Sequence, residues 1–168
     1  MTKATGAIFQ VHFRRRREGR TDYQKRLSHL KSGKVRMIVR KTNKYVYVAF
    51  ANFDLLGDRI IASITSKSLL KLGYPGKCNT PSAYLTGLYC GMLAKGKGVT
   101  QAVLDIGRHD ATKGGLLFAA LKGASDCGIK IPFSDSILPD ENRLAGRHLE
   151  GDGALKFDEC KGKIMKVK

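Results

Sequence analysis

From Val35 the hydrophobic and polar positions follow a period of two. Arg36, Ile38 and Arg40 fall on one face of an extended segment and Met37 and Val39 on the other, and a turn at Thr42-Asn43 leads into a second alternating segment. Period-two alternation between short polar turns is typical of half-buried antiparallel strands. The pattern therefore predicts a three-stranded antiparallel meander, with strands at residues 35–41, 45–50 and 59–65.

A short helix is predicted just before this meander. Thr21 followed by Gln24 is a capping-box pattern, and Tyr23, Leu27 and Leu30 form an apolar stripe at positions i, i+4 and i+7. We expect the stripe to dock on the folded domain and to leave the neighbouring cations pointing outwards.

Two longer helices are predicted further along the chain. One covers Pro81–Lys95, with Gly87 and Gly91 on a face that suits close approach to a sheet; the other covers residues 116–127. A short buried strand at residues 101–106 lies between them, and a strand that follows a helix after a meander implies a crossover. The predicted fold class is α/β, a mixed sheet of the meander plus the crossover strand with helices packed on it.

Helical and strand periodicity fade after residue 131. Residues 131–168 hold seven acids and seven bases with little repeat, which indicates an irregular extension that orders on a partner or stays loose. The predicted organisation is a basic N-terminal arm over residues 1–20, an α/β domain over residues 21–131 and a C-terminal extension over residues 132–168.

Basic residues are concentrated at the N-terminal end of the chain. The chain has 168 residues and a net charge of +17, and residues 1–44 alone hold fourteen basic side chains and two acids. Such a concentration favours a polyanionic partner. No apolar run approaches the ~18 residues that a membrane span requires, so no membrane partner is predicted.

Metal, nucleotide and catalytic sites are disfavoured. The four cysteines are 12, 37 and 33 residues apart, too far for a local zinc motif, and we expect them to be reduced packing residues. Residues 91–97 match the start of a Walker A loop, but Gly98 replaces its Ser/Thr and the segment closes a helix. Asp105, His109 and Asp110 cluster at a strand end without a nucleophile, so we expect Asp105 to brace the following loop. No cofactor or metal is predicted.

Two further features suit RNA. Tyr45 and Tyr47 alternate along the hairpin opposite the basic strand, and this face could stack bases, although burial of the tyrosines in the core is an equal alternative. Lys113-Gly114-Gly115 precedes a helix, where glycines can bare backbone N–H groups for a phosphate.

Five segments, in order along the chain, together resemble one known family. They are FRRRREGRTDYQKRL (13–27), NTPSAYLTG (79–87), AVLDIG (102–107), TKGGLLFAALKGASDCG (112–128) and PDENRLAGRHL (139–149). The chain resembles the archaeal and eukaryotic branch of large-subunit ribosomal protein family eighteen, which binds 5S rRNA. The resemblance implies a cytoplasmic, non-catalytic RNA binder in the central protuberance of the large ribosomal subunit, with a ribonuclease-H-like motif. Its implied partners are 5S rRNA, large-subunit rRNA and neighbouring ribosomal proteins.

The family's RNA contacts carry over as expectations onto matching positions. They are Arg14, Arg15, Arg16, Arg17, Arg20, Lys25, Arg26, Arg36, Arg40, Lys41, Thr112, Lys113 and Gly114. The chain departs from the family pattern at Leu116 and Leu117, where a basic residue is common, and at Asp110. Two alternatives stay open: an RNA-processing nuclease of ribonuclease-H-like fold, whose first strand here lacks the required carboxylate, and a nonspecific polyanion-binding protein.

Overall fold

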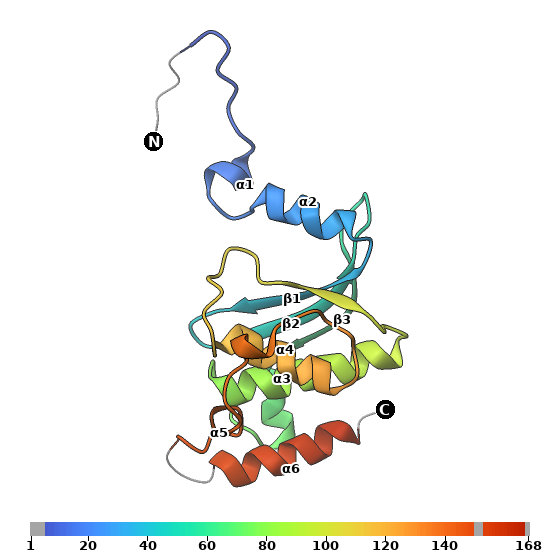
Figure 1. Cartoon of the computed structure of the whole chain (residues 1–168), viewed down its shortest axis with the longest axis vertical. Helices are drawn as coiled ribbons and strands as arrows, with labels where there is room; N and C mark the ends of the chain where they lie inside the picture. Colours follow the sequence, from blue (N-terminus) through green and yellow to red (C-terminus); the bar gives the residue numbers. More distant parts are fainter. Residues whose placement is uncertain (1–5, 150–152, 167–168) are drawn as a thin grey trace.

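A four-stranded mixed sheet forms the centre of the molecule (Figure 1). In this computed structural model, residues 6–149 and 153–166 are described. The strands are β1 (Val35–Lys41), β2 (Val46–Asn52), β3 (Arg59–Thr65) and β4 (Ala102–Asp105), in the spatial order β3-β2-β1-β4. β1 pairs antiparallel with β2 and parallel with β4, and β2 pairs antiparallel with β3. The predicted meander with a crossover strand is confirmed.

The hydrophobic core packs against one face of the sheet. Met37, Val39 and Phe50 are fully buried there, as the alternation along β1 and β2 predicts. The alternation breaks in β3. Ala62 of β3 pairs with Phe50 of β2, but Ile60 pairs with the next residue, Ala51, so a bulge shifts the register there, and Ile60 is 62% exposed. A bulge places two residues of one strand opposite one of its partner, so the face on which side chains lie changes at that point.

Helices α3 (Thr80–Gly96) and α4 (Leu116–Asp126) cover that core face (Figure 1). The 3-10 helix η1 (Ser66–Leu72) precedes α3 and ends at Gly73 in the left-handed conformation. A Cβ atom on Gly87 would lie 2.0 Å from the carbonyl oxygen of Ala120 in α4. The close approach predicted at Gly87 is therefore to a helix and not to the sheet, because α3 is sandwiched between the sheet and other helices and is buried nearly all round.

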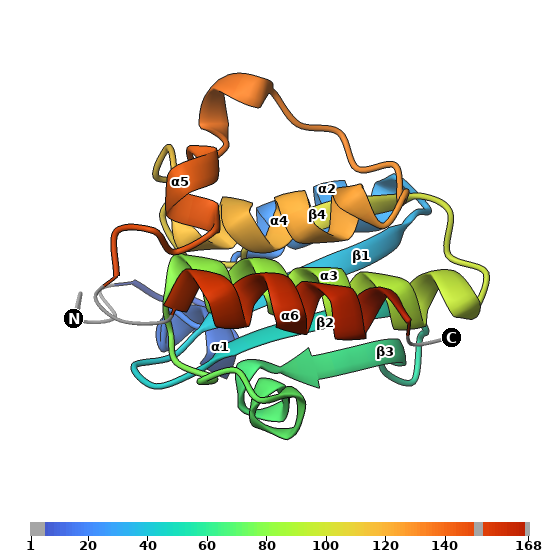
Figure 2. The same ribbon diagram turned by 90° about the horizontal axis from the view of Figure 1, so that it is seen from below.

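The C-terminal extension contains a helix that the sequence analysis missed. After the short η2 (Asp135–Ile137) and α5 (Glu141–Leu144), helix α6 (Gly153–Met165) packs on α3 on the side away from the sheet (Figure 2). Phe157, Cys160 and Ile164 are buried, and the rings of Phe157 and Tyr84 have centroids 5.6 Å apart. The expectation of an irregular tail is wrong here, because these apolar residues at i, i+3 and i+7 complete the outer side of α3.

The cysteines behave as packing residues. Cys90, Cys127 and Cys160 are buried, Cys78 is half-buried, and all four are free thiols. Burial raises the pKa of Cys90 to about 12, because its thiolate would lie far from water. Cys90, Cys127 and Cys160 are thus packing residues, as predicted.

The basic N-terminal segment folds into α1 (Arg14–Arg17) and α2 (Tyr23–Lys31), on the opposite side of the sheet from α3 and α4 (Figure 1). The N-cap of α2 is Asp22 and not Thr21: its carboxylate accepts from the backbone N–H groups of Gln24 and Lys25, both at 3.1 Å. Leu27 is 53% exposed, so the predicted docking of the apolar stripe is wrong. Charge holds α2 in place instead, as described below. No helix in residues 6–149 and 153–166 is long and apolar enough to cross a membrane.

Candidate nucleic-acid interface

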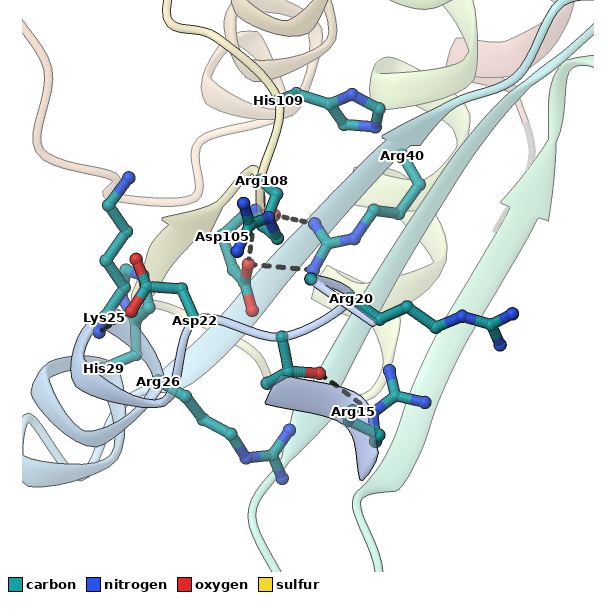
Figure 3. Close-up of a pocket in the computed structure, with 13 residues that line it drawn as sticks. Arg15, Arg20, Asp22, Lys25, Arg26, His29, Arg40, Asp105, Arg108 and His109 are labelled. Atoms are coloured by element: carbon teal, nitrogen blue, oxygen red, sulfur yellow. Dashed lines mark hydrogen bonds and ion pairs between the residues drawn. The ribbon is translucent and has the colours of Figure 1, made fainter. Parts of the chain in front are cut away.

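A cationic hollow of about 380 Å³ lies between the N-terminal arm, α2, the end of β1 and the loop that follows β4 (Figure 3). Its walls contain six Lys and Arg side chains and two carboxylates. The lining residues are Arg15, Gly19, Arg20, Thr21, Asp22, Lys25, Arg26, His29, Arg40, Asp105, Gly107, Arg108 and His109. Five residues predicted from sequence to contact RNA, on three separate segments, are thus brought to one place.

A chain of ion pairs beneath this hollow connects α2 to the sheet. The side chain of Arg36 is 3% exposed, and its Nη2 lies 2.7 Å from Asp58 Oδ2, while its Nη1 lies 3.3 Å from Asp105 Oδ2. Asp58 also pairs with Arg26 of α2 at 3.2 Å, and Asp105 pairs with Arg40 at 2.9 Å. We call these five residues the ion-pair chain. Asp58, in the loop before β3, therefore joins α2 to the buried Arg36 of β1.

Asp105 is the centre of the ion-pair chain. Its Oδ1 accepts from Arg40 Nη2 and from the backbone N–H of Gly107 at 2.8 Å. Burial alone would raise the pKa of Asp105, but the Arg40 guanidinium and the Gly107 hydrogen bond outweigh it and hold the pKa below its ordinary value. The carboxylate therefore braces the loop after β4, as predicted.

A hydrogen bond and two ion pairs within residues 14–21 hold the base of the arm in its fold at the edge of the hollow. Arg15 Nε donates to Thr21 Oγ1 at 2.9 Å, and Glu18 pairs with Arg20 at 3.0 Å and with Arg14 at 3.5 Å. These interactions are exposed, so each contributes at most a few tenths to about 1 kcal/mol. The arginines of α1 keep most of their surface in water, where a polyanion can reach them.

The remaining predicted residues lie outside the hollow. Lys41 is exposed beside it, and its backbone N–H donates to His109 Nε2 at 3.3 Å. Thr112 and Lys113 are exposed on the neighbouring loop. The expectation that glycines there bare their N–H groups is wrong, because Gly114 N donates to Ile137 O at 2.9 Å and Gly115 N to Thr112 O at 3.0 Å.

The outer face of the hairpin is partly open. Tyr47 is 46% exposed and lies opposite Arg40 on β1, while Tyr45 is half-buried. Burial of Tyr47 in the core, one of the two alternatives, is therefore wrong, because its neighbours Val46 and Val48 point into the core instead.

Three basic or imidazole side chains of the hollow, His29, Arg108 and His109, were not among the predicted contacts. Arg108 follows β4, which runs parallel to β1 with Ile38 opposite Asp105. The carboxyl ends of parallel strands meet at one edge of a sheet, so the pairing of β1 with β4 was the signal that joins Arg108 to Arg40.

The fold and the cationic hollow define the class of the protein: a basic α/β domain built to bind a polyanion. In the described residues, no group of three or more His, Cys, Asp or Glu side chains could hold a metal ion. The family described as ribosomal large subunit proteins 60S L5 and 50S L18 matches residues 7–95 and 91–134. The chain belongs to this family.

Several archaeal relatives agree. The large ribosomal subunit protein uL18 of Korarchaeum cryptofilum is 53% identical over 161 residues, covering 91% of this chain and 83% of the relative. The uL18 of Methanoregula boonei is 46% identical over 164 residues, covering 97% and 91%. That of Methanococcus maripaludis is 50% identical over 148 residues, covering 88% and 77%. The predicted family, its structural and non-enzymatic role and its place on the cytoplasmic ribosome are confirmed.

Proposed function

We propose that this protein binds 5S rRNA and helps attach it to large-subunit rRNA in the central protuberance, beside neighbouring ribosomal proteins. The observation that carries the proposal is the cationic hollow, in which the arm, α2, β1 and the loop after β4 present six Lys and Arg side chains together. The family match supports a ribosomal RNA as the polyanion.

The proposed contacts divide by exposure. Those on the arm and α2 neutralise phosphates, and those at the end of β1 and on the loop before α4 extend the surface. Gly114 leaves this set because its N–H is already donated to Ile137 O. The proposed contacts are Arg14, Arg15, Arg16, Arg17, Arg20, Lys25, Arg26, Arg40, Lys41, Thr112 and Lys113. Arg36 has a different role. It is buried and paired with two carboxylates, so it positions Arg26 and Arg40 through Asp58 and Asp105.

A nuclease is the weaker alternative. β1 carries no carboxylate, and Asp105, the acid at the end of β4, is already held by two arginines and a backbone N–H. Two-metal catalysis needs several carboxylates that are free to hold metal ions.

The test is a salt titration of binding to 5S rRNA and to an unrelated structured RNA of equal length. Binding of 5S rRNA is expected to be tighter at every salt concentration. The double variant Arg15→Gln/Arg20→Gln should bind more weakly, with a log-log salt slope shallower by roughly 0.7–0.9 for each phosphate that is no longer neutralised.

A matched control removes the same charge elsewhere. Lys67 and Lys77 are exposed, and neither lines the hollow. Lys67→Gln/Lys77→Gln should leave the salt slope as in the unchanged protein. Equal binding of the two RNAs, or equal effects of the two double variants, would favour a nonspecific polyanion binder.

A further inference from the structure

We propose that the cationic hollow takes up one unpaired nucleotide of the RNA, base included, and does not only touch backbone phosphates. This inference rests on the proposed function and names the chemical group that the hollow recognises. It is argued from the size of the hollow, from the planar side chains in its walls and from its charge.

The hollow is too large for a phosphate alone. At ~30 Å³ for each water molecule, a volume of about 380 Å³ holds about a dozen waters. A phosphate group has five heavy atoms and would leave most of that space to solvent. A nucleotide has about twenty heavy atoms, and pockets for ligands of such size begin at roughly 300 Å³.

The walls offer planar groups on which a base can stack. His29, His109, Arg40 and Arg108 all line the hollow (Figure 3). Unpaired RNA bases commonly stack on histidine rings and on guanidinium planes. The Arg40 guanidinium is fixed at two points, because its Nη1 donates to the backbone oxygen of Asp105 at 2.6 Å and its Nη2 to the Asp105 carboxylate at 2.9 Å. A plane held in this way costs little further entropy on binding.

His109 is also held in a defined state. The backbone N–H of Lys41 donates to its Nε2, which therefore accepts and carries no proton. Burial, and then the charges of Lys41 and Arg40, lower the pKa of His109, against the smaller opposite effect of Asp110. A neutral, oriented imidazole is suited to stacking.

The charge of the hollow favours a phosphate at the arm side. Arg15, Arg20 and Lys25 come from the arm and α2, whereas the two carboxylates are already engaged. Asp105 accepts from Arg36, Arg40 and Gly107, and Asp22 caps α2. A nucleotide would thus place its phosphate against these cations and its base against one of the planar side chains in the walls.

Nuclear magnetic resonance of the four histidines tests this placement. The full chain is titrated with uridine 5′-monophosphate, adenosine 5′-monophosphate and inorganic phosphate at constant ionic strength. We expect a nucleotide to shift the ring signals of His29 and His109 and to leave those of His12 and His148 unchanged. We also expect it to bind about tenfold tighter than phosphate, equivalent to about 1.4 kcal/mol. Equal affinity for phosphate, or unshifted His29 and His109 signals, would overturn the proposal.

Variants separate this inference from the proposed function. His29→Ala and His109→Ala should each reduce the preference for nucleotide over phosphate at least threefold, while the salt slope for 5S rRNA stays the same because every phosphate-binding cation is retained. His148→Ala is the matched control and should change neither quantity. If the unchanged protein prefers nucleotides yet binds both RNAs equally, the proposed function fails and the nucleotide site stands. If the unchanged protein prefers 5S rRNA yet binds nucleotides no tighter than phosphate, the proposed function stands and the nucleotide site fails.

Discussion

Removing both carboxylates around Arg36 should cost more stability than the two single changes together. In Asp105→Asn, Arg36 keeps its closer partner, Asp58, at 2.7 Å; in Asp58→Asn it keeps Asp105 at 3.3 Å. Each single change removes charge-assisted hydrogen bonds and should cost about 2 kcal/mol. In the double variant the buried guanidinium has no counter-charge, a condition that costs ~3–5 kcal/mol by itself. We therefore expect a total of about 6 kcal/mol, with a coupling of about 2 kcal/mol.

Urea unfolding followed by circular dichroism measures these differences. With a slope of ~2 kcal/mol per molar urea, each single variant should unfold at about 1 M less urea and the double variant at about 3 M less. Adding Arg36→Met to the double variant removes the unpaired charge and should recover about 2 kcal/mol, because a buried apolar side chain needs no partner. Strictly additive single effects, or a triple variant no more stable than the double one, would refute the idea that Arg36 is held by both carboxylates.

Three further predictions concern the scaffold. Gly87→Ala would put a Cβ atom 2.0 Å from Ala120 O and should cost at least ~1–3 kcal/mol in thermal unfolding, whereas Gly96→Ala, with nothing within 4 Å, should be near neutral. Phe157→Ala should cost ~3–5 kcal/mol if α6 completes the core, and a loss below 1 kcal/mol would contradict that packing. Because the pKa of Asp105 is lowered on folding, its contribution to stability is full above its unfolded pKa of ~3.9 and is lost as pH falls through the folded pKa. The urea midpoints of the unchanged protein and Asp105→Asn should thus differ most at pH 7 and converge as the pH falls below ~3.9.

The sheet could be predicted from sequence because the signals for each strand, its hydrophobic pattern and the turns that flank it, are local. β3 was placed at residues 59–65 from alternation and flanking turns alone, and the structure has Arg59–Thr65. Helix α2 shows the limit of that reasoning. Its stripe of Tyr23, Leu27 and Leu30 predicts a buried face, but its position is set by Arg26 and Asp58, which are 32 residues apart. A local pattern does not reveal such a distant charge pair.

The candidate site was only partly predictable for the same reason. Exposed arginines on the arm are evident from sequence, because nothing apolar alternates with them. The burial of Arg36 is not, since Asp58 lies in the loop before β3 and Asp105, at the end of β4, is 69 residues away. Helix α6 differs, since the spacing of Phe157, Cys160 and Ile164 is a helical signal in the sequence, although the balanced charges of residues 131–168 obscure it.

The ion-pair chain also limits how this protein can change over evolutionary time. Arg36, Asp58 and Asp105 belong to or adjoin three different strands, and the buried charge of Arg36 needs at least one of the two carboxylates. Loss of one carboxylate therefore makes the other indispensable, so we expect at least one of the two to be retained wherever Arg36 is. The exposed arginines of α1 are under no such restriction and can exchange with lysine one at a time. We therefore expect the buried ion pairs of Arg36 to be retained among relatives, while the exposed basic residues of α1 vary.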